Sequence, residues 1–98
     1  MTVLAFARYP VEPASETHFK QLVDEHLARI RSAGGALWAD AAKAMDDEPS
    51  YILLSEWRTS ADLDAWETTN EAQDLRDRSD GYLRGEVTRR RFDGGGTT

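Results

Sequence analysis

The sequence predicts an α+β domain in which strands and helices follow one another as β-α-β-β-α-β. One observation behind this is the stretch 51–75, where a strand-like apolar run passes directly into a helix that carries Trp66. A second is the segment 16–33, whose apolar residues recur every three or four positions, as on one face of a helix. A third is the segment 2–9, which is apolar on both alternating faces and is typical of a buried strand.

Residues 2–9 (TVLAFARY) are expected to form the first strand, and the two prolines behind it end it because proline cannot donate to a ladder. Ser15 is expected to cap the helix 16–33. Two glycines then end this helix by supplying a left-handed cap. The apolar stripe of the helix includes His26 and is otherwise formed by Phe19, Leu22, Val23, Leu27 and Ile30.

The segment 36–45 (ALWADAAKAM) is ambiguous, because its alanines favour a helix while glycines before it and an acidic turn after it leave little room. We expect a strand, since a hairpin through the acidic turn 46–48 would pair it with residues 51–58. That second segment (YILLSEWR) has the length and composition of a strand.

Two helix starts follow the strand 51–58. Thr59 or Ser60 can cap the first, because either hydroxyl can accept a hydrogen bond from a free backbone N–H, and Asp62 lies in the first turn, where the helix dipole favours a carboxylate. Asn70 can cap the second, with Gln73 three residues on as in a capping box. We therefore expect a short helix, a bend and another helix.

Residues 86–92 (EVTRRRF) are expected to form the last strand of a domain spanning 1–93, with 94–98 as a flexible tail. Right-handed crossovers place both helices on one face of a four-stranded antiparallel sheet in the spatial order 4-1-3-2, which is the ferredoxin-like arrangement. Because the first and third strands are apolar on both faces, the uncovered face should meet a second sheet. A two-fold homodimer is the simplest solution.

Composition excludes several functional classes. A chain of 98 residues with 40% hydrophobic and 31% charged residues predicts one globular domain. The net charge of −6 argues against nucleic-acid binding, and the lack of a long apolar run or basic leader predicts a cytoplasmic protein without a membrane segment. There is no cysteine for thiol chemistry and no GxSxG, P-loop, GxGxxG or HExxH motif.

Three features of residues 2–92 carry a family resemblance: the opening strand VLAFARYPVEP, the junction SEWRTSADLDAW and the helical piece that begins at Asn70. With these features the chain resembles the antibiotic biosynthesis monooxygenase (ABM) domain of the dimeric α/β-barrel superfamily. The resemblance implies a ferredoxin-like fold that forms an α/β barrel with a second copy. The superfamily includes cofactor-independent quinone-forming oxygenases, haem-degrading oxygenases and isomerases, so the fold alone does not give the function.

The haem-degrading branch fits poorly. Its members resemble this chain in a helix tryptophan, at Trp66, but follow it with a histidine iron ligand, where this chain reads QDLRD (73–77). They also place an asparagine near the end of the first strand, where residues 7–9 are ARY. Without an imidazole ligand the haem scheme is not expected.

The quinone-forming branch fits better and implies a site without cofactor or metal. A phenol or enol that loses its proton can reduce dioxygen directly, given an apolar pocket, a base, and donors for the developing negative charge. Trp66 matches the branch's helix tryptophan. Two positions depart from its pattern, because Asp62 stands where its members have an asparagine one turn earlier, and Ala72 stands where they have a tyrosine shortly after. Arg89, Arg90 and Arg91 are candidates for its arginine on the last strand, without a choice among them.

The expected catalytic residues are therefore Trp66 as wall and N–H donor, His26 as proton acceptor, and an arginine that holds the anion. Of the last strand, Arg89 and Arg91 are taken as catalytic candidates. The expected substrate-binding residues are Trp38, Asp62, Tyr82 and Phe19.

Three functions stay open. The first is a cofactor-independent monooxygenase acting on a small aromatic or polyketide-like substrate. The second is a non-oxidative ligand-binding or isomerase-like protein using the same cavity, and the third is an accessory dimer domain without catalysis. A cavity reached by Trp66, His26 and an arginine would favour the first two. An interior filled by Phe19, Leu63 and Trp66 would favour the third.

Overall fold

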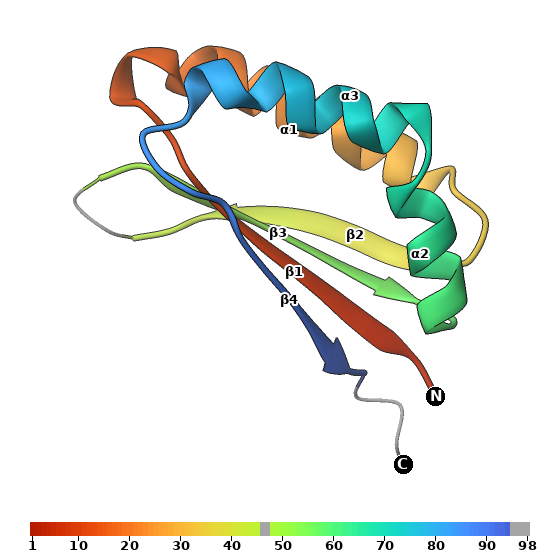
Figure 1. Cartoon of the computed structure of the whole chain (residues 1–98). Helices are drawn as coiled ribbons and strands as arrows, with labels where there is room; N and C mark the ends of the chain where they lie inside the picture. Colours follow the sequence, from red (N-terminus) through yellow and green to blue (C-terminus); the bar gives the residue numbers. More distant parts are fainter. Residues whose placement is uncertain (46–47, 95–98) are drawn as a thin grey trace.

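The computed structural model describes residues 1–45 and 48–94, and Figure 1 shows helices laid across one face of a single sheet. The predicted order β-α-β-β-α-β is confirmed, with the second helix divided into two pieces at a bend. The strands are β1 (Val3–Pro10), β2 (Ala36–Lys43), β3 (Ser50–Trp57) and β4 (Thr88–Asp93). The helices are α1 (Glu16–Arg31), α2 (Ser60–Glu67) and α3 (Asn70–Ser79), with short 3-10 turns η1 (Pro13–Ser15) and η2 (Asp80–Tyr82).

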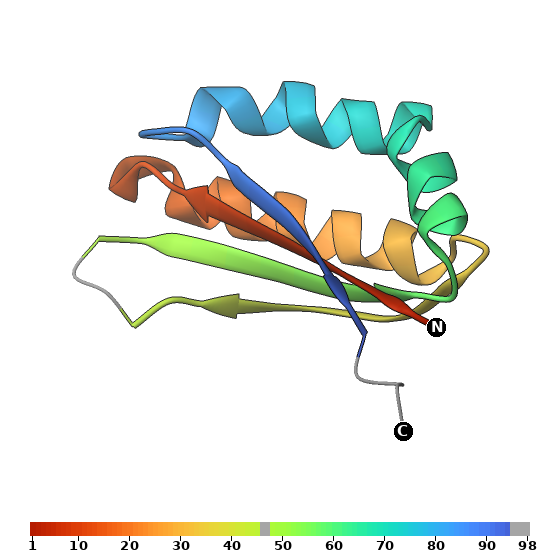
Figure 2. The same ribbon diagram turned by 60° about the horizontal axis from the view of Figure 1, so that its bottom comes forward.

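The sheet is antiparallel throughout, with the spatial order β2-β3-β1-β4. This is the predicted order 4-1-3-2 read from the other edge, so the ferredoxin-like prediction is confirmed. The ambiguous segment 36–45 forms β2 and pairs with β3, as the hairpin interpretation required. Figure 2 shows the two central strands, β1 and β3, beneath α1 and α3, while no helix of the described residues lies on the opposite face of the sheet.

Helix capping follows the prediction in part. The Thr59 hydroxyl accepts the N–H of Asp62 at 3.1 Å and so caps α2. Ser15 stands at the start of α1, but its side chain makes no capping hydrogen bond. At α3 the prediction that Asn70 caps is wrong, because the hydroxyl of Thr69 accepts the capping N–H at 3.2 Å and Asn70 is already helical. The N-cap residue of α3 is therefore Thr69, one residue earlier than predicted.

The ends of two predicted elements differ slightly. Helix α1 stops at Arg31, and the turn after it ends at Gly35, whose φ of 91° only glycine adopts readily. A β-carbon there would also lie 2.5 Å from the carboxyl carbon of Asp62. Strand β4 begins at Thr88, and Gly94 behind it is buried, with its N–H donating to the carbonyl of Thr2 at 2.9 Å. Residues 46–47 of the predicted acidic turn and 95–98 of the predicted tail lie outside the described residues.

The core lies between the sheet and the helices. The predicted stripe of α1 is confirmed, because all six of its residues are buried. At the N-terminal half of α1 the Phe19 side chain, 1% exposed, meets the ring of Tyr9 at 5.4 Å and that of Tyr51 at 5.6 Å. We call this region the packed end.

The uncovered face of the sheet is rich in exposed apolar side chains. Trp38 is 42% exposed and Phe92 is 44% exposed, and the ring of Phe6 meets that of Phe92 edge-on at 6.4 Å. Phe6 of β1 pairs with Leu54 of β3 on this face, so both central strands carry apolar side chains on both faces, as expected. In the described part of the chain, no helix is both long enough and apolar enough to cross a membrane.

Candidate functional site

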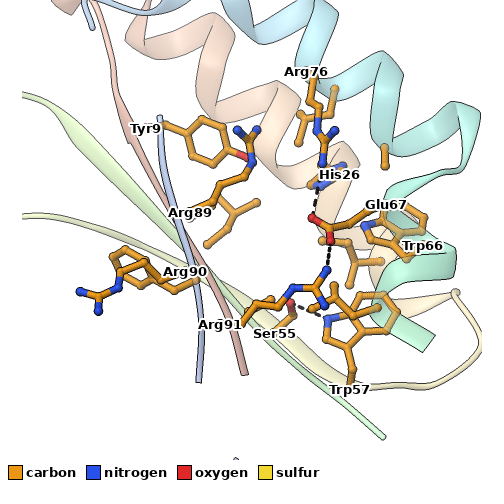
Figure 3. A pocket seen from close by; sticks show the side chains of 18 residues that line it. Tyr9, His26, Ser55, Trp57, Trp66, Glu67, Arg76, Arg89, Arg90 and Arg91 are labelled. Atoms are coloured by element: carbon orange, nitrogen blue, oxygen red, sulfur yellow. Dashed lines mark hydrogen bonds and ion pairs between the residues drawn. The ribbon is translucent and has the colours of Figure 1, made fainter. Parts of the chain in front are cut away.

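A cavity of about 290 Å³ lies between the sheet and the helices, beneath the C-terminal half of α1 and against α2 and α3. Figure 3 shows side chains from the sheet and from all three helices converging on it. The residues that matter below come from β1 (Ala5, Ala7, Tyr9), β3 (Leu53, Ser55, Trp57), β4 (Arg89, Arg91) and the helices (His26, Ile30, Leu63, Trp66, Glu67, Ala72, Leu75, Arg76). We call this region the open end.

Small residues on the sheet leave room for the cavity. Ala5 and Ala7 point toward the helices from β1, since side chains on one face of a strand recur every two residues. Ala5 pairs with Ser55 of β3, another small residue that lines the cavity. The small side chains on the sheet therefore leave empty space, which the larger side chains around it enclose.

Three rings form one wall. The indole of Trp66 stacks on that of Trp57, with centroids 6.2 Å apart and planes 27° apart. The imidazole of His26 meets Trp66 from the other side at 5.6 Å. Trp57 is fixed from below, because its Nε1–H donates to the hydroxyl of Ser55 at 2.9 Å. Flat aromatic walls of this kind suit a planar ligand.

His26 is a buried imidazole with spare hydrogen-bonding capacity. The residue is 6% exposed, and no group of the described chain bonds to its Nδ1. Burial lowers its pKa to about 4, and the positive charges of Arg29 and Arg89 act in the same direction. The ring is therefore neutral at pH 7 and able to accept a proton or a hydrogen bond.

The three consecutive arginines of β4 alternate between the two faces of the sheet. Arg89 and Arg91 pair with Ala7 and Ala5, and Figure 3 shows them on the cavity side, with Arg90 directed away from them. The guanidinium of Arg90 instead lies 5.4 Å from the ring centre of Phe92 on the uncovered face. The sequence left open which arginine faces inward; strand alternation selects Arg89 and Arg91.

Arg91 is already neutralised by carboxylates. It donates to Asp64 at 2.7 Å and to Ser60 at 3.1 Å, and it also pairs with Glu67, so it ties β4 to α2. These bonds raise its pKa, the bond to Asp64 most of all. Glu67 has a second partner, because its other oxygen lies 3.4 Å from the guanidinium of Arg76.

Arg89 differs from Arg91 in having no carboxylate partner among the ion pairs of residues 1–45 and 48–94. Its guanidinium lies 5.9 Å from the ring centre of Tyr9 instead. Burial raises the pKa of the Tyr9 hydroxyl, although Arg89 opposes the shift. Tyr9 is thus a protonated donor at neutral pH, beside a cation whose charge is not matched.

The structure brings all four predicted catalytic residues to one cavity: Trp66, His26, Arg89 and Arg91. The four predicted substrate-binding residues lie elsewhere. Trp38 is on the uncovered face, where its Nε1–H donates to Glu56 at 2.7 Å, and Phe19 fills the packed end. Tyr82 stacks on His18 at 6.1 Å, and Asp62 lines a separate hollow between α1 and α2.

Sequence reasoning missed Tyr9, Glu67 and Arg76 as lining residues. Tyr9 shares the alternating face of Ala5 and Ala7, so strand period was a usable signal for it. Glu67 follows Trp66 directly, and its orientation depends on where α2 ends. Arg76 stands in the stretch 73–77, which sequence reasoning searched only for a histidine.

The donor set suits an organic ligand better than a metal. Within residues 1–45 and 48–94 no group of three or more histidine, aspartate or glutamate side chains is arranged to hold a metal ion. The cavity instead combines aromatic walls, a neutral imidazole, a phenol donor and an unmatched guanidinium. Such an arrangement can bind a planar hydroxylated molecule and stabilise its anion.

Comparisons with known proteins agree with this fold. A solved protein of Mycobacterium tuberculosis superposes with a TM-score of 0.87 at 18% identity, covering 96% of this chain and 95% of its own. A proposed antibiotic biosynthesis monooxygenase from Nitrosomonas europaea superposes with a TM-score of 0.90 at 16% identity, covering 99% of this chain and 93% of its own. At such identities the likeness shows the fold alone. No match was found among curated proteins.

The family itself is shown by a different comparison. The profile of the antibiotic biosynthesis monooxygenase family matches residues 2–78, which include the strand β1, the β3–α2 junction and nearly all of α3. The match covers the three sequence features that carried the resemblance, and it ends before β4. The chain belongs to the antibiotic biosynthesis monooxygenase (ABM) family.

Proposed function

We propose that this protein is a cofactor-independent monooxygenase that oxidises a small aromatic or polyketide-like phenol in the cavity of the open end. The observation that carries the proposal is His26, a buried neutral imidazole in an aromatic wall, whose Nδ1 has no partner among the described residues. Unsatisfied buried polar atoms are rare in folded proteins and call for an explanation. A hydroxyl group of a bound aromatic ring would use the spare capacity of this imidazole.

The proposed reaction begins with transfer of the phenol proton to His26. The low pKa of the free imidazole makes it a weak base, but a phenolate formed beside it would favour the protonated ring. Arg89 and the hydroxyl of Tyr9 would stabilise the phenolate oxygen. Trp66 and Trp57 would hold the ring plane and exclude water.

The electron-rich ring carbon of the phenolate then supplies electrons to dioxygen, and a carbon–oxygen bond forms. Cleavage of the oxygen–oxygen bond leaves one atom in the product as a quinone oxygen and releases the other as water. One phenol and one dioxygen thus give one quinone and one water. The substrate is the reductant, so atoms and electrons balance without another redox partner.

We also propose that two copies pair through the uncovered faces of their sheets, as the family resemblance implies. Trp38, Leu54 and Phe92 are exposed there, and a second copy would bury them. Light scattering should give twice the chain mass, and Phe92→Asp should shift the protein toward monomer. A monomeric wild-type protein at micromolar concentration would overturn this arrangement. The expected cytoplasmic location stays a prediction.

The alternative is a ligand-binding or isomerase-like protein that uses the same cavity without oxygen. The open cavity favours both functions over an accessory domain without a ligand. Oxygen consumption separates the two.

The test is oxygen uptake with a panel of hydroxynaphthalenes and anthrones, followed together with quinone absorbance. The expected result is one dioxygen consumed per quinone formed. His26→Gln should lower turnover by about 10²–10⁴-fold, as loss of a general base does. His18→Gln is the matched control, because His18 stacks on Tyr82 away from the cavity. Binding of these compounds without oxygen uptake would favour the alternative.

A further inference from the structure

Another hollow adjoins the cavity of the open end, and two arginines line both. It lies between the end of α3 and the segment leading into β4, with a volume of about 460 Å³. Arg76 of α3 and Arg89 of β4 line both hollows. These two side chains therefore stand at the neck between the inner cavity and the outer hollow.

At this neck, Arg89 is the arginine whose charge no carboxylate pairs within the described residues. Arg76 pairs with Glu67, and Arg91 pairs with Glu67 and Asp64.

Arg76 can also be released at little cost. Its ion pair with Glu67 is long, at 3.4 Å, and Glu67 keeps Arg91 as a partner if Arg76 turns away. Figure 3 shows Arg76 reaching toward the cavity from α3, while Arg89 reaches up from β4 beside Tyr9. An anionic group at the neck could thus be held from two walls at once.

The outer hollow disfavours a second negative charge on a bound ligand. Asp80 and Glu86 line it beyond the two arginines. A second anionic group placed there would be repelled, and a neutral one would not.

We propose that the substrate is an aromatic compound with a single anionic substituent, such as a carboxylate, and that Arg76 and Arg89 bind this substituent at the neck while the ring lies against Trp66. The inference rests on the proposed function, because it names the substrate class of the same cavity. It makes Arg76 a specificity-determining residue. It concerns binding and is independent of whether oxygen reacts.

The experiment compares matched acids and amides under nitrogen, so that no turnover occurs. The probes are 3-hydroxy-2-naphthoate with 3-hydroxy-2-naphthamide, and salicylate with salicylamide, titrated by calorimetry. Wild-type protein should bind each acid about tenfold or more tightly than its amide, as expected for charge-assisted hydrogen bonds. Arg76→Gln should remove most of this preference while leaving amide affinity within about threefold. Arg89→Gln should also reduce the preference, but it should weaken amide binding as well, because Arg89 is proposed to contact the phenol oxygen that acid and amide share.

Arg78→Gln is the matched control, because Arg78 lies on the same helix but pairs with Glu25 and Asp74 on the surface. It should leave the acid-to-amide ratio unchanged. Equal affinity for acid and amide, equal losses for both in Arg76→Gln, or binding of neither pair would overturn the inference. Acid preference without oxygen uptake would overturn the proposed oxygenase activity and support this inference. Oxygen uptake without acid preference would support the oxygenase activity and overturn this inference.

Discussion

The same helix, α1, covers a filled interior at one end and a hollow at the other. At the packed end Phe19 meets the rings of Tyr9 and Tyr51, both within 5.6 Å. At the open end, His26 meets Trp66 above a floor that includes Ala5 and Ala7. The two ends carry side chains of similar size on the helix, so the difference comes from the sheet. Alanines opposite large side chains thus leave the space that forms the cavity.

The two ends also differ in how they treat buried polar groups. The Tyr51 hydroxyl at the packed end donates to Glu16 at 2.8 Å, and burial together with this bond raises its pKa to about 12. At the open end the Nδ1 of His26 has no partner within the described chain. At the packed end the buried hydroxyl has its hydrogen-bond partner within the protein. At the open end a buried polar atom is left that a ligand can satisfy.

The largest effect is expected from truncating the packed end. Phe19→Ala should lower the free energy of unfolding by about 3–5 kcal/mol, because a fully buried ring leaves a void that its neighbours cannot fill. Chemical denaturation with an unchanged m-value would measure it. A loss below about 1 kcal/mol would mean that this end is as open as the other.

Adding volume should distinguish a filled part of the core from the cavity. Ala39→Leu, at a buried position of β2 that belongs to the core cluster and does not line the cavity, should cost about 1–3 kcal/mol by overpacking. Ala7→Leu adds the same atoms above the cavity floor and should cost clearly less, since the cavity takes up the side chain. It should also weaken binding of hydroxynaphthalenes by at least about tenfold. Equal destabilisation by both variants would contradict the presence of free volume above Ala7.

Acid should destabilise the open end before the carboxylates titrate. The pKa of His26 is about 4 in the folded protein, below its ordinary value of 6.5, so the unfolded chain binds the proton more strongly. Stability from this group is complete above pH 6.5 and is lost as the pH falls toward 4. The expected loss between pH 7 and pH 5 is about 2 kcal/mol. His26→Leu should abolish most of this dependence, and His18→Gln should keep it; an unchanged slope in His26→Leu would refute the assignment.

The smallest effect concerns the helix starts. Thr69→Ala should cost about 1 kcal/mol, because Thr69 caps α3 over the open end. Ser15→Ala at the start of α1 should cost almost nothing, since the hydroxyl of Ser15 makes no capping bond. Thermal unfolding of the two variants side by side measures the contrast. A larger loss for Ser15→Ala would reverse it.

Much of the fold could be predicted because periodicity is local. The stripe of α1 and the two-faced strands β1 and β3 repeat over enough residues to identify each element, and handedness rules then leave one arrangement. Trp66 and His26 could be placed in the interior for the same reason. That Trp66 and His26 line the same cavity could be predicted only after the arrangement of the helices on the sheet had been predicted correctly.

The rest depended on features without a sequence signal. A register shift between Ala36 and Trp38 makes Trp38 pair with Glu56, so a residue that period two would place with Ala36 lies on the opposite face. Asp62 in the first turn of α2 lies close to Gly35 in the turn after α1, a contact between segments far apart in sequence. The volume of the cavity likewise depends on how many side chains pack together, so no single residue of the sequence predicts it.

The arginine run of β4 has a consequence for how this site can change over time. A deletion or insertion of one residue before β4 would move every side chain of that strand to the other face. With a lone arginine, the cavity would lose its cation in a single step. With Arg89, Arg90 and Arg91 in succession, Arg90 would turn inward and a guanidinium would remain. The repeat thus makes the charge of the cavity robust to length changes in the preceding loop, where insertions are most easily tolerated.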